Sequence, residues 1–131
     1  MKKELFICGL TALMICAASC KTQEKAAAKL TEKYWKLTEL SGEPVVTPKG
    51  GKEAHMILKK EDNRINGNSG CNTFNGIYTL KTGNRIAFSQ MTSTLMMCLN
   101  MDTETKMKQV FETADNYAIS GDILVLNNAD G

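Results

Sequence analysis

The sequence predicts a mainly β domain: a small antiparallel, barrel-like sheet with one amphipathic helix. Short strand-like runs follow one another with only a few turn residues between them, which is the spacing of β-hairpins. Apolar and polar residues alternate within several runs, as in strands that bury one face. A single segment near the C-terminus has helical spacing instead. So few short strands cannot form two full layers, and we therefore expect a sheet that curls into a barrel covered by the helix.

The N-terminus resembles an export signal. Lys2 and Lys3 precede the largely apolar run 5–18, which is shorter than the roughly 20 residues of a spanning helix. Small residues directly before Cys20 resemble a bacterial lipobox, which implies thioether attachment of a diacylglycerol to Cys20 and cleavage ahead of it. The alternative is an ordinary signal peptide that is cut nearby. An acylated Cys20 would anchor the protein in a lipid bilayer, because each buried methylene contributes about 0.8 kcal/mol.

The rest of the chain divides into a tether and one domain. Residues 21–33 are polar and rich in alanine, and we expect them to link the lipid to the domain, since a helix this short is marginal in water. The folded domain is then expected to cover residues 34–131. Its predicted strands are 34–40, 55–60, 64–67, 76–80, 85–91, 116–120 and 122–127.

The predicted helix covers residues 103–115. Met107, Val110, Phe111 and Ala114 have the spacing i, i+3, i+4 and i+7, which places them on one face. Asp102 precedes this segment at the position where an N-cap is expected. The helix therefore has an apolar side that can pack against the sheet.

Composition argues against nucleic-acid and metal binding. Residues 1–20 contain two lysines and one glutamate, so the remainder has 14 basic and 13 acidic side chains, against 16 and 14 in the whole chain. The basic residues are scattered, whereas nucleic-acid binding needs a basic patch. One histidine and isolated cysteines do not supply the three or four closely spaced ligands of a zinc site. We therefore expect no nucleic-acid partner, no metal and no cofactor.

The segment 67–76, GNSGCNTFNG, raises the question of catalysis. Ser69 lacks the Gly-x-Ser-x-Gly pattern of a serine nucleophile, because Gly70 stands one position too early. Cys71 as a nucleophile would need a base, and His55, the only histidine, is more simply explained as a rim residue at the start of a strand. Glycines and asparagines favour tight, left-handed backbone, so we expect a structural bend and no enzyme activity.

Two cysteines remain after processing. Cys71 and Cys98 form an even pair in an exported protein, which favours one disulfide over two free thiols. Loop-closure entropy suggests that this bridge stabilises the fold by roughly 3 to 4 kcal/mol. We expect it to hold the bend in place, with Phe74 in the core.

Several motifs together resemble the META domain, the family of the HslJ-like envelope proteins. They are residues 35–37 (WKL), 67–78 (GNSGCNTFNGIY), 93–98 (STLMMC) and 117–126 (YAISGDILVL). The resemblance spans nearly all of the chain after the signal. It implies a small β-barrel-like domain with one helix, frequently found as a bacterial lipoprotein and linked to heat, antibiotic and envelope stress. It supplies no catalytic residues.

The resemblance identifies only motif positions in this sequence and implies one feature of its topology. Besides the two cysteines, the positions are Gly70, Asn72, Gly76, Tyr78, Thr94 and Met97. In the family a further strand follows a turn like residues 128–131, where this sequence stops. Either the chain is naturally shortened or the sequence is incomplete, and a barrel without its last strand would have an unpaired neighbouring edge that invites another chain.

The leading functional hypothesis is a non-enzymatic lipoprotein of the bacterial cell envelope, anchored in the outer membrane through Cys20, which acts in stress or binds an envelope protein. The alternative is a barrel that binds a small apolar ligand, because methionine adapts to irregular surfaces. A thiol enzyme that uses Cys71 is the third. The methionines after the signal are Met56, Met91, Met96, Met97, Met101 and Met107.

Overall fold

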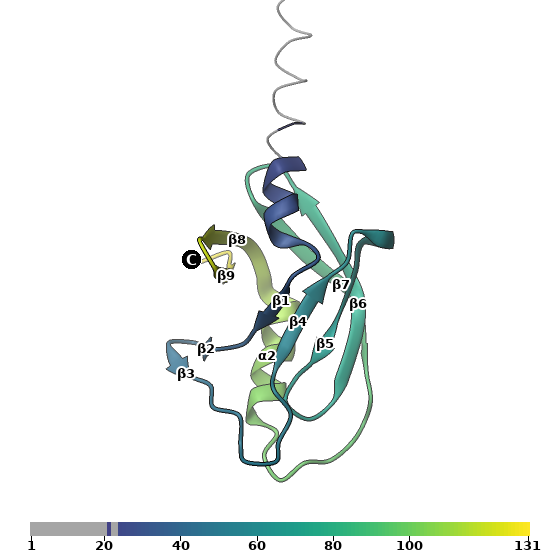
Figure 1. Ribbon diagram of the computed structural model, residues 1–131, viewed down its shortest axis with the longest axis vertical. Coiled ribbons are helices and arrows are strands. Elements are labelled where there is room, and N and C mark those ends of the chain that lie inside the picture. Colours follow the sequence, from purple (N-terminus) through teal and green to yellow (C-terminus); the bar gives the residue numbers. More distant parts are fainter. Residues whose placement is uncertain (1–20, 22–23) are drawn as a thin grey trace, which may run out of the picture.

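The computed structural model describes residue 21 and residues 24–131, and seven of its strands form one antiparallel sheet in the order β1-β4-β5-β6-β7-β8-β9. The sheet curls around helix α2 (Asp102–Thr113) into a barrel that is open along one seam (Figure 1). This confirms the predicted fold class. The strands are β1 (Tyr34–Lys36), β4 (His55–Leu58), β5 (Arg64–Asn68), β6 (Thr73–Lys81), β7 (Arg85–Ser93), β8 (Ala114–Ser120) and β9 (Ile123–Asn128).

Alternation along the strands builds the core. In β6, Phe74 and Tyr78 are buried on the inner face, and Gly76 lies between them because a side chain there would meet the Met91 sulfur. The Phe111 ring of α2 lies with its centroid 5.0 Å from that of Phe74, in a tilted arrangement. Such aromatic pairs add about 0.5–1.5 kcal/mol beyond the area that they bury. The helix is therefore packed against the concave side of the sheet.

The helix differs from the prediction at both ends. Met101 is the N-cap residue, not Asp102, and the Asp102 backbone N–H is satisfied by Asn100 Oδ1 at 2.8 Å. The helix ends at Thr113 because Ala114 already begins β8. Residues buried on its inner face include Met107 and Phe111, as predicted, together with Glu104.

The folded domain begins earlier than predicted. Residues 24–30 are helical, and Leu30 is fully buried in the core instead of lying in a free tether. The Trp35 indole donates a hydrogen bond to the Leu30 carbonyl at 2.8 Å, and Glu32 accepts one from the Lys60 backbone at 2.7 Å. A domain boundary at Tyr34 is therefore wrong by several residues. Residues 1–20, with Cys20 and the expected lipid site, lie outside the described part of the chain.

The bounds of the predicted strands shift by a few residues, and two strands differ most, for local reasons. The run 34–40 divides, because β1 ends at Lys36 and the chain continues into a small hairpin, β2 (Glu39–Leu40) and β3 (Glu43–Pro44). Ser41 and Gly42 have positive φ at its tip, as two-residue hairpin turns require. Strand β6 begins at Thr73, so the bend expected over residues 67–76 reduces to the four residues 69–72. A short 3-10 helix, η1 (Glu61–Asn63), connects β4 to β5.

Candidate functional site: a groove at the seam of the barrel

The two predicted cysteines are bonded in this structure. Cys71 lies in the bend between β5 and β6, and Cys98 lies in the long connection from β7 to α2, with 6.0 Å between the two Cα atoms. The bridge joins segments that are 27 residues apart in sequence. It therefore holds the connection 94–101 against the end of the barrel.

Asn72 is the centre of a polar network beside the bridge. Its side-chain oxygen accepts hydrogen bonds from the Thr94 hydroxyl at 2.8 Å and from the Met96 backbone N–H at 2.7 Å. Its amide nitrogen donates to the Met96 carbonyl and to the Glu104 carboxylate, both at 3.0 Å. Only 1% of Asn72 is exposed, so these bonds replace water almost completely. The residue ties the bend, the long connection and the helix together.

Glu104 is the charged member of this network. Its carboxylate is 2% exposed, and it accepts bonds from the Ser69 hydroxyl at 2.9 Å and the Asn72 backbone N–H at 3.1 Å. Lys108 lies 3.1 Å away, one helical turn along. Burial by itself raises the pKa of Glu104, but the donors from Asn72, Lys108 and Ser69 together outweigh it and hold the pKa below its ordinary value. The carboxylate is therefore a buried, fully bonded anion with no face toward solvent.

The other motif residues, except Met97, contribute to the backbone conformation, packing or hydrogen bonding of the barrel. Gly70 has φ +96°, a conformation that side-chain-bearing residues rarely adopt. Gly76 makes room for Met91, and the Tyr78 hydroxyl donates to the Lys59 carbonyl at 2.9 Å. Met97 is 87% exposed and packs against nothing in the core. It belongs to an apolar stretch of the connection, with Leu95 and Leu99, whose side chains also face solvent.

The residues considered for catalysis are not brought together. Cys71 is in the disulfide, and the Ser69 hydroxyl faces Glu104. His55 stacks on Tyr34 with 4.3 Å between the ring centroids, and its Nδ1 lies 3.0 Å from the Glu53 carbonyl. Within residues 24–131 no three His, Cys, Asp or Glu side chains are grouped so as to hold a metal ion.

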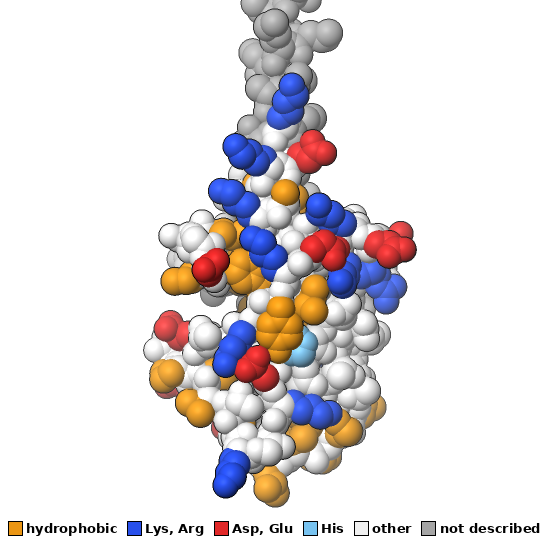
Figure 2. All heavy atoms as spheres, in the orientation of Figure 1, with side chains coloured by type: hydrophobic (Ala, Val, Ile, Leu, Met, Phe, Trp, Pro, Cys, Tyr) orange, Lys and Arg blue, Asp and Glu red, His pale blue; other side chains and the backbone are white. Residues whose placement is uncertain are grey.

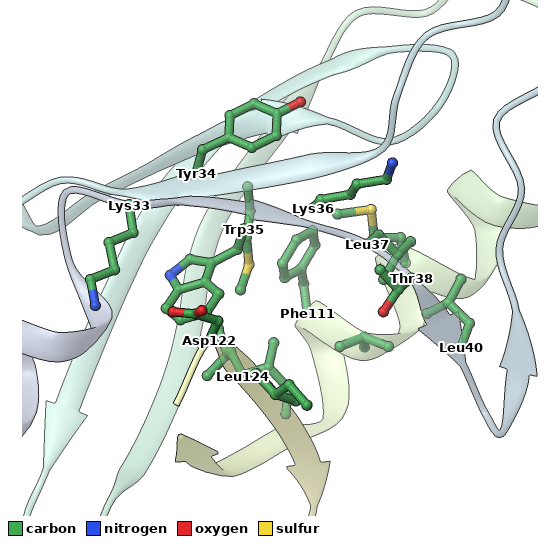
Figure 3. Close-up of a pocket in the computed structure, with 15 residues that line it drawn as sticks. Lys33, Tyr34, Trp35, Lys36, Leu37, Thr38, Leu40, Phe111, Asp122 and Leu124 are labelled. Carbon is green, nitrogen blue, oxygen red and sulfur yellow. The ribbon is translucent and has the colours of Figure 1, made fainter. Parts of the chain in front are cut away.

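An open groove lies along the seam, where β1 and β9 face each other without pairing. Its volume is about 640 Å³. Figure 3 shows Trp35, Phe111 and Leu124 pointing into it. Lys33 and Asp122 lie at one end and Leu40 at the other. Met56 and Met107 complete the apolar floor, so two of the six methionines line this groove.

The groove continues into a second, more polar hollow. That hollow is lined by the β2–β3 hairpin, the outer side of α2 and the end of β9, and its volume is about 550 Å³. In Figure 2 the surface is notched at the left, between the part that carries the end of β9 and the part that carries the hairpin. The seam is thus accessible from solvent along its length.

Sequence reasoning did not identify the groove. Alternation within the predicted strand 34–40 places Trp35 and Leu37 on one face, and nothing in this pattern indicates that the face lies opposite β9. The one available signal was the number of predicted strands, because an odd number of antiparallel strands leaves two edges that run in the same direction. The prediction of an unpaired edge rested on the family resemblance alone.

Searches with sequence and structure agree with this architecture. The model of the META domain family matches residues 28–131. No curated protein matches the sequence. The fold is similar to that of a protein from Burkholderia xenovorans solved by NMR, with a TM-score of 0.64 and 21% identity over 82% of this chain and 81% of that one. At 21% identity this similarity is evidence for the fold alone.

Proposed function

The chain belongs to the META domain family, and on that premise we propose that it is a non-enzymatic binding domain, tethered to the cell envelope, whose binding site is the groove between β1 and β9. One observation carries the proposal. The groove combines an apolar floor with a volume of about 640 Å³, within the roughly 300–1,000 Å³ of typical ligand sites. At the seam a partner can reach apolar side chains that belong to or pack against the core, among them Trp35 and Phe111.

The polar network of Ser69, Asn72 and Glu104 supports a non-enzymatic role, because it is closed to solvent. A catalytic group must reach its substrate, whereas Ser69, Asn72 and Glu104 are each at most 5% exposed and bonded to one another. Among the described residues every buried side-chain nitrogen and oxygen has a hydrogen-bond partner. A network satisfied in this way rigidifies a fold. We assign the motif residues to stability and the groove to binding.

The anchoring part of the proposal rests on the N-terminal sequence. Cys20 follows a signal-like segment, and Lys21, Lys25 and Lys29 come next at intervals of four residues. Figure 2 shows blue basic side chains gathered along the helical segment next to the grey N-terminal part. Lysines close to an anionic membrane surface contribute about 1 kcal/mol each. The described residues include no helix that is long and apolar enough to cross a bilayer.

The anchor has a direct test. Metabolic labelling with a radioactive fatty acid is expected to label the wild-type protein and not Cys20→Ala, and only the wild type should sediment with membranes. Equal labelling of both forms would refute lipid attachment at Cys20. Separation of inner and outer membranes then tests the outer-membrane location.

The binding role is tested by genetic complementation. Ile123 lines the groove yet is 65% exposed, so Ile123→Glu changes the site without removing core packing. Val46 is 80% exposed and lies outside the groove, which makes Val46→Glu the matched control. In a deletion strain challenged with heat or envelope-targeting antibiotics, wild type and Val46→Glu should restore tolerance, while Ile123→Glu should fail at equal protein level. Full rescue by Ile123→Glu would overturn the groove assignment, and an unchanged deletion strain would overturn the stress role.

A small apolar molecule is the second candidate occupant. Met56 and Met107 give the floor an adaptable surface, and the volume suits a small ligand. Native mass spectrometry of freshly purified protein should then reveal an added mass that Ile123→Glu loses.

A further inference from the structure

The two halves of the disulfide differ in their access to solvent. Cys71 is only 2% exposed, whereas Cys98 belongs to the exposed surface of the connection 94–101. A thiolate opens a disulfide by displacing one sulfur from the other, and access decides which of the two sulfurs it attacks. An incoming thiolate can therefore reach the sulfur of Cys98, and the sulfur of Cys71 is the leaving group.

The surface around Cys98 is apolar and uncharged. Residues 86–101 contain no Asp, Glu, Lys, Arg or His. Leu95, Met97 and Leu99 flank the cysteine in the chain, and each of them is at least 87% exposed. A group of exposed apolar side chains on a folded domain indicates contact with another molecule. This surface favours an attacking thiolate that is carried by a protein over a small charged thiol.

The position of the connection in the fold leaves it open to such a protein. In Figure 1 the connection between β7 and α2 forms one end of the domain, and the helical segment 24–30 lies at the opposite end. The chain leads from segment 24–30 toward the proposed lipid site at Cys20. The end that carries Cys98 is therefore accessible in a free domain and in one that is tethered through its N-terminus.

We infer that Cys98 is a site of reversible thiol–disulfide exchange with a soluble dithiol protein. The partner's thiolate attacks the sulfur of Cys98, the bond between the two sulfurs of the bridge breaks, and Cys71 leaves as a thiolate that takes up a proton. The second thiolate of the partner then displaces Cys98 from the mixed disulfide. In total two electrons and two protons pass from the partner to the bridge, and the partner becomes the disulfide.

The structure already holds a hydrogen-bond acceptor for the buried product. The sulfur of Cys71 lies 3.6 Å from the carbonyl oxygen of Met96. Once Cys71 is a thiol, its S–H can donate to this oxygen, so reduction leaves no buried polar group without a partner at this position. The reduced state is therefore compatible with the packing around Cys71.

The remaining contacts of the connection limit what reduction releases. Asn72 accepts hydrogen bonds from the Thr94 hydroxyl at 2.8 Å and from the Met96 backbone N–H at 2.7 Å, and neither bond involves the bridge. At the other end Met101 is the N-cap residue of α2. Opening the bridge therefore frees residues 97–100, between two points that stay fixed. The exchange controls how rigidly the exposed apolar side chains of this segment are presented.

Mass mapping identifies the sulfur that is attacked, because trypsin places Cys71 in peptide 65–81 and Cys98 in peptide 86–106. The probe is a thioredoxin whose second active-site cysteine is replaced by serine, which stops the reaction at the mixed disulfide. The native protein is treated with the probe and quenched in acid, and free thiols are alkylated with N-ethylmaleimide after denaturation. We expect the probe on peptide 86–106 and maleimide on peptide 65–81, in roughly tenfold excess or more over the reverse arrangement. Equal amounts on the two peptides would overturn one-sided attack at Cys98, because attack through global unfolding makes both sulfurs accessible.

Substitutions on the exposed surface test the kind of partner. Leu95→Ser and Leu99→Ser together remove apolar contacts without touching the core, and Val46→Ser, at an 80% exposed position outside the connection, is the matched control. The double variant should react with the thioredoxin probe several-fold more slowly than the wild type and with glutathione at an unchanged rate. Val46→Ser should leave both rates unchanged. An unchanged rate of the double variant with thioredoxin would overturn the protein partner and assign the site to small thiols.

NMR of the reduced, nitrogen-15-labelled protein tests the extent of the change. Shifts are expected in residues 97–101 and in the bend around Cys71, while the signals of the strands keep their positions. Spectral changes throughout the sheet would overturn a local release of the connection. Alkylation of the reduced, folded protein supplies a second measurement: maleimide should modify Cys98 roughly tenfold faster than Cys71 or more, and equal rates would contradict the difference in access.

Discussion

Replacing Asn72 with alanine should destabilise the protein by about 3 kcal/mol. The substitution removes one hydrogen bond to the buried Glu104 carboxylate, and a bond to a charged group contributes about 1.5–3 kcal/mol. It also removes the bonds with Thr94 and with the Met96 backbone. Thr94 and Met96 lie at the exposed end of the network, where water can take the place of Asn72 as their hydrogen-bond partner. Each of these lost bonds therefore lowers the free energy of unfolding by only about 0.5 kcal/mol.

Urea denaturation of the oxidised protein measures this loss. The transition midpoint should fall while the slope of free energy against urea stays constant, because the surface exposed on unfolding hardly changes. Asn75→Ala is the control, since Asn75 is an exposed neighbour in β6 whose side chain takes no part in the network, and it should stay within about 0.5 kcal/mol of the wild type. A loss below about 1 kcal/mol for Asn72→Ala would refute the view that the motif asparagine is a structural centre.

Three further predictions concern stability. The pKa of Glu104 is lowered in the folded state, so its contribution to the free energy of unfolding is complete above the unfolded pKa of about 4.3 and is lost as pH falls through the folded pKa. Between pH 7 and pH 3 the urea midpoint should therefore fall more for the wild type than for Glu104→Gln. Reducing the Cys71–Cys98 bridge should cost roughly 3 to 4 kcal/mol in the same assay, and an unchanged midpoint would contradict a stabilising bridge. Leu30→Ala should cost about 2–4 kcal/mol, whereas an effect below about 0.5 kcal/mol would restore the domain boundary at Tyr34.

Features that depend on nearby residues were predictable from the sequence. The alternation that buries Phe74 and Tyr78, and the helical spacing of Met107 and Phe111, are local patterns that survive in the structure. The pairing of the two cysteines followed from their number. The burial of Leu30 could not be predicted, because a single leucine at the end of a polar segment has no periodicity. Its burial depends on contacts with Trp35 and the sheet.

The polar network and the candidate binding groove depend on long-range contacts. Asn72 and Glu104 are 32 residues apart, and nothing in the local sequence shows that a helix glutamate will turn inward to meet an asparagine in a bend. The groove likewise forms only when the sheet curls far enough to bring Trp35 opposite Leu124. Within the motif that stands out in sequence, Cys71 and Asn72 join the bend to the long connection and the helix, whereas the open apolar groove lies between β1 and β9.

In-cell photocrosslinking tests the central claim most directly. A photoreactive phenylalanine analogue is placed at Ile123 in the groove, or at Val46 as the exposed control outside it. The account predicts an ultraviolet-dependent adduct with another polypeptide from position 123 and none from position 46. Equal adducts from both positions, or an adduct from position 46 alone, would contradict a binding site at the seam.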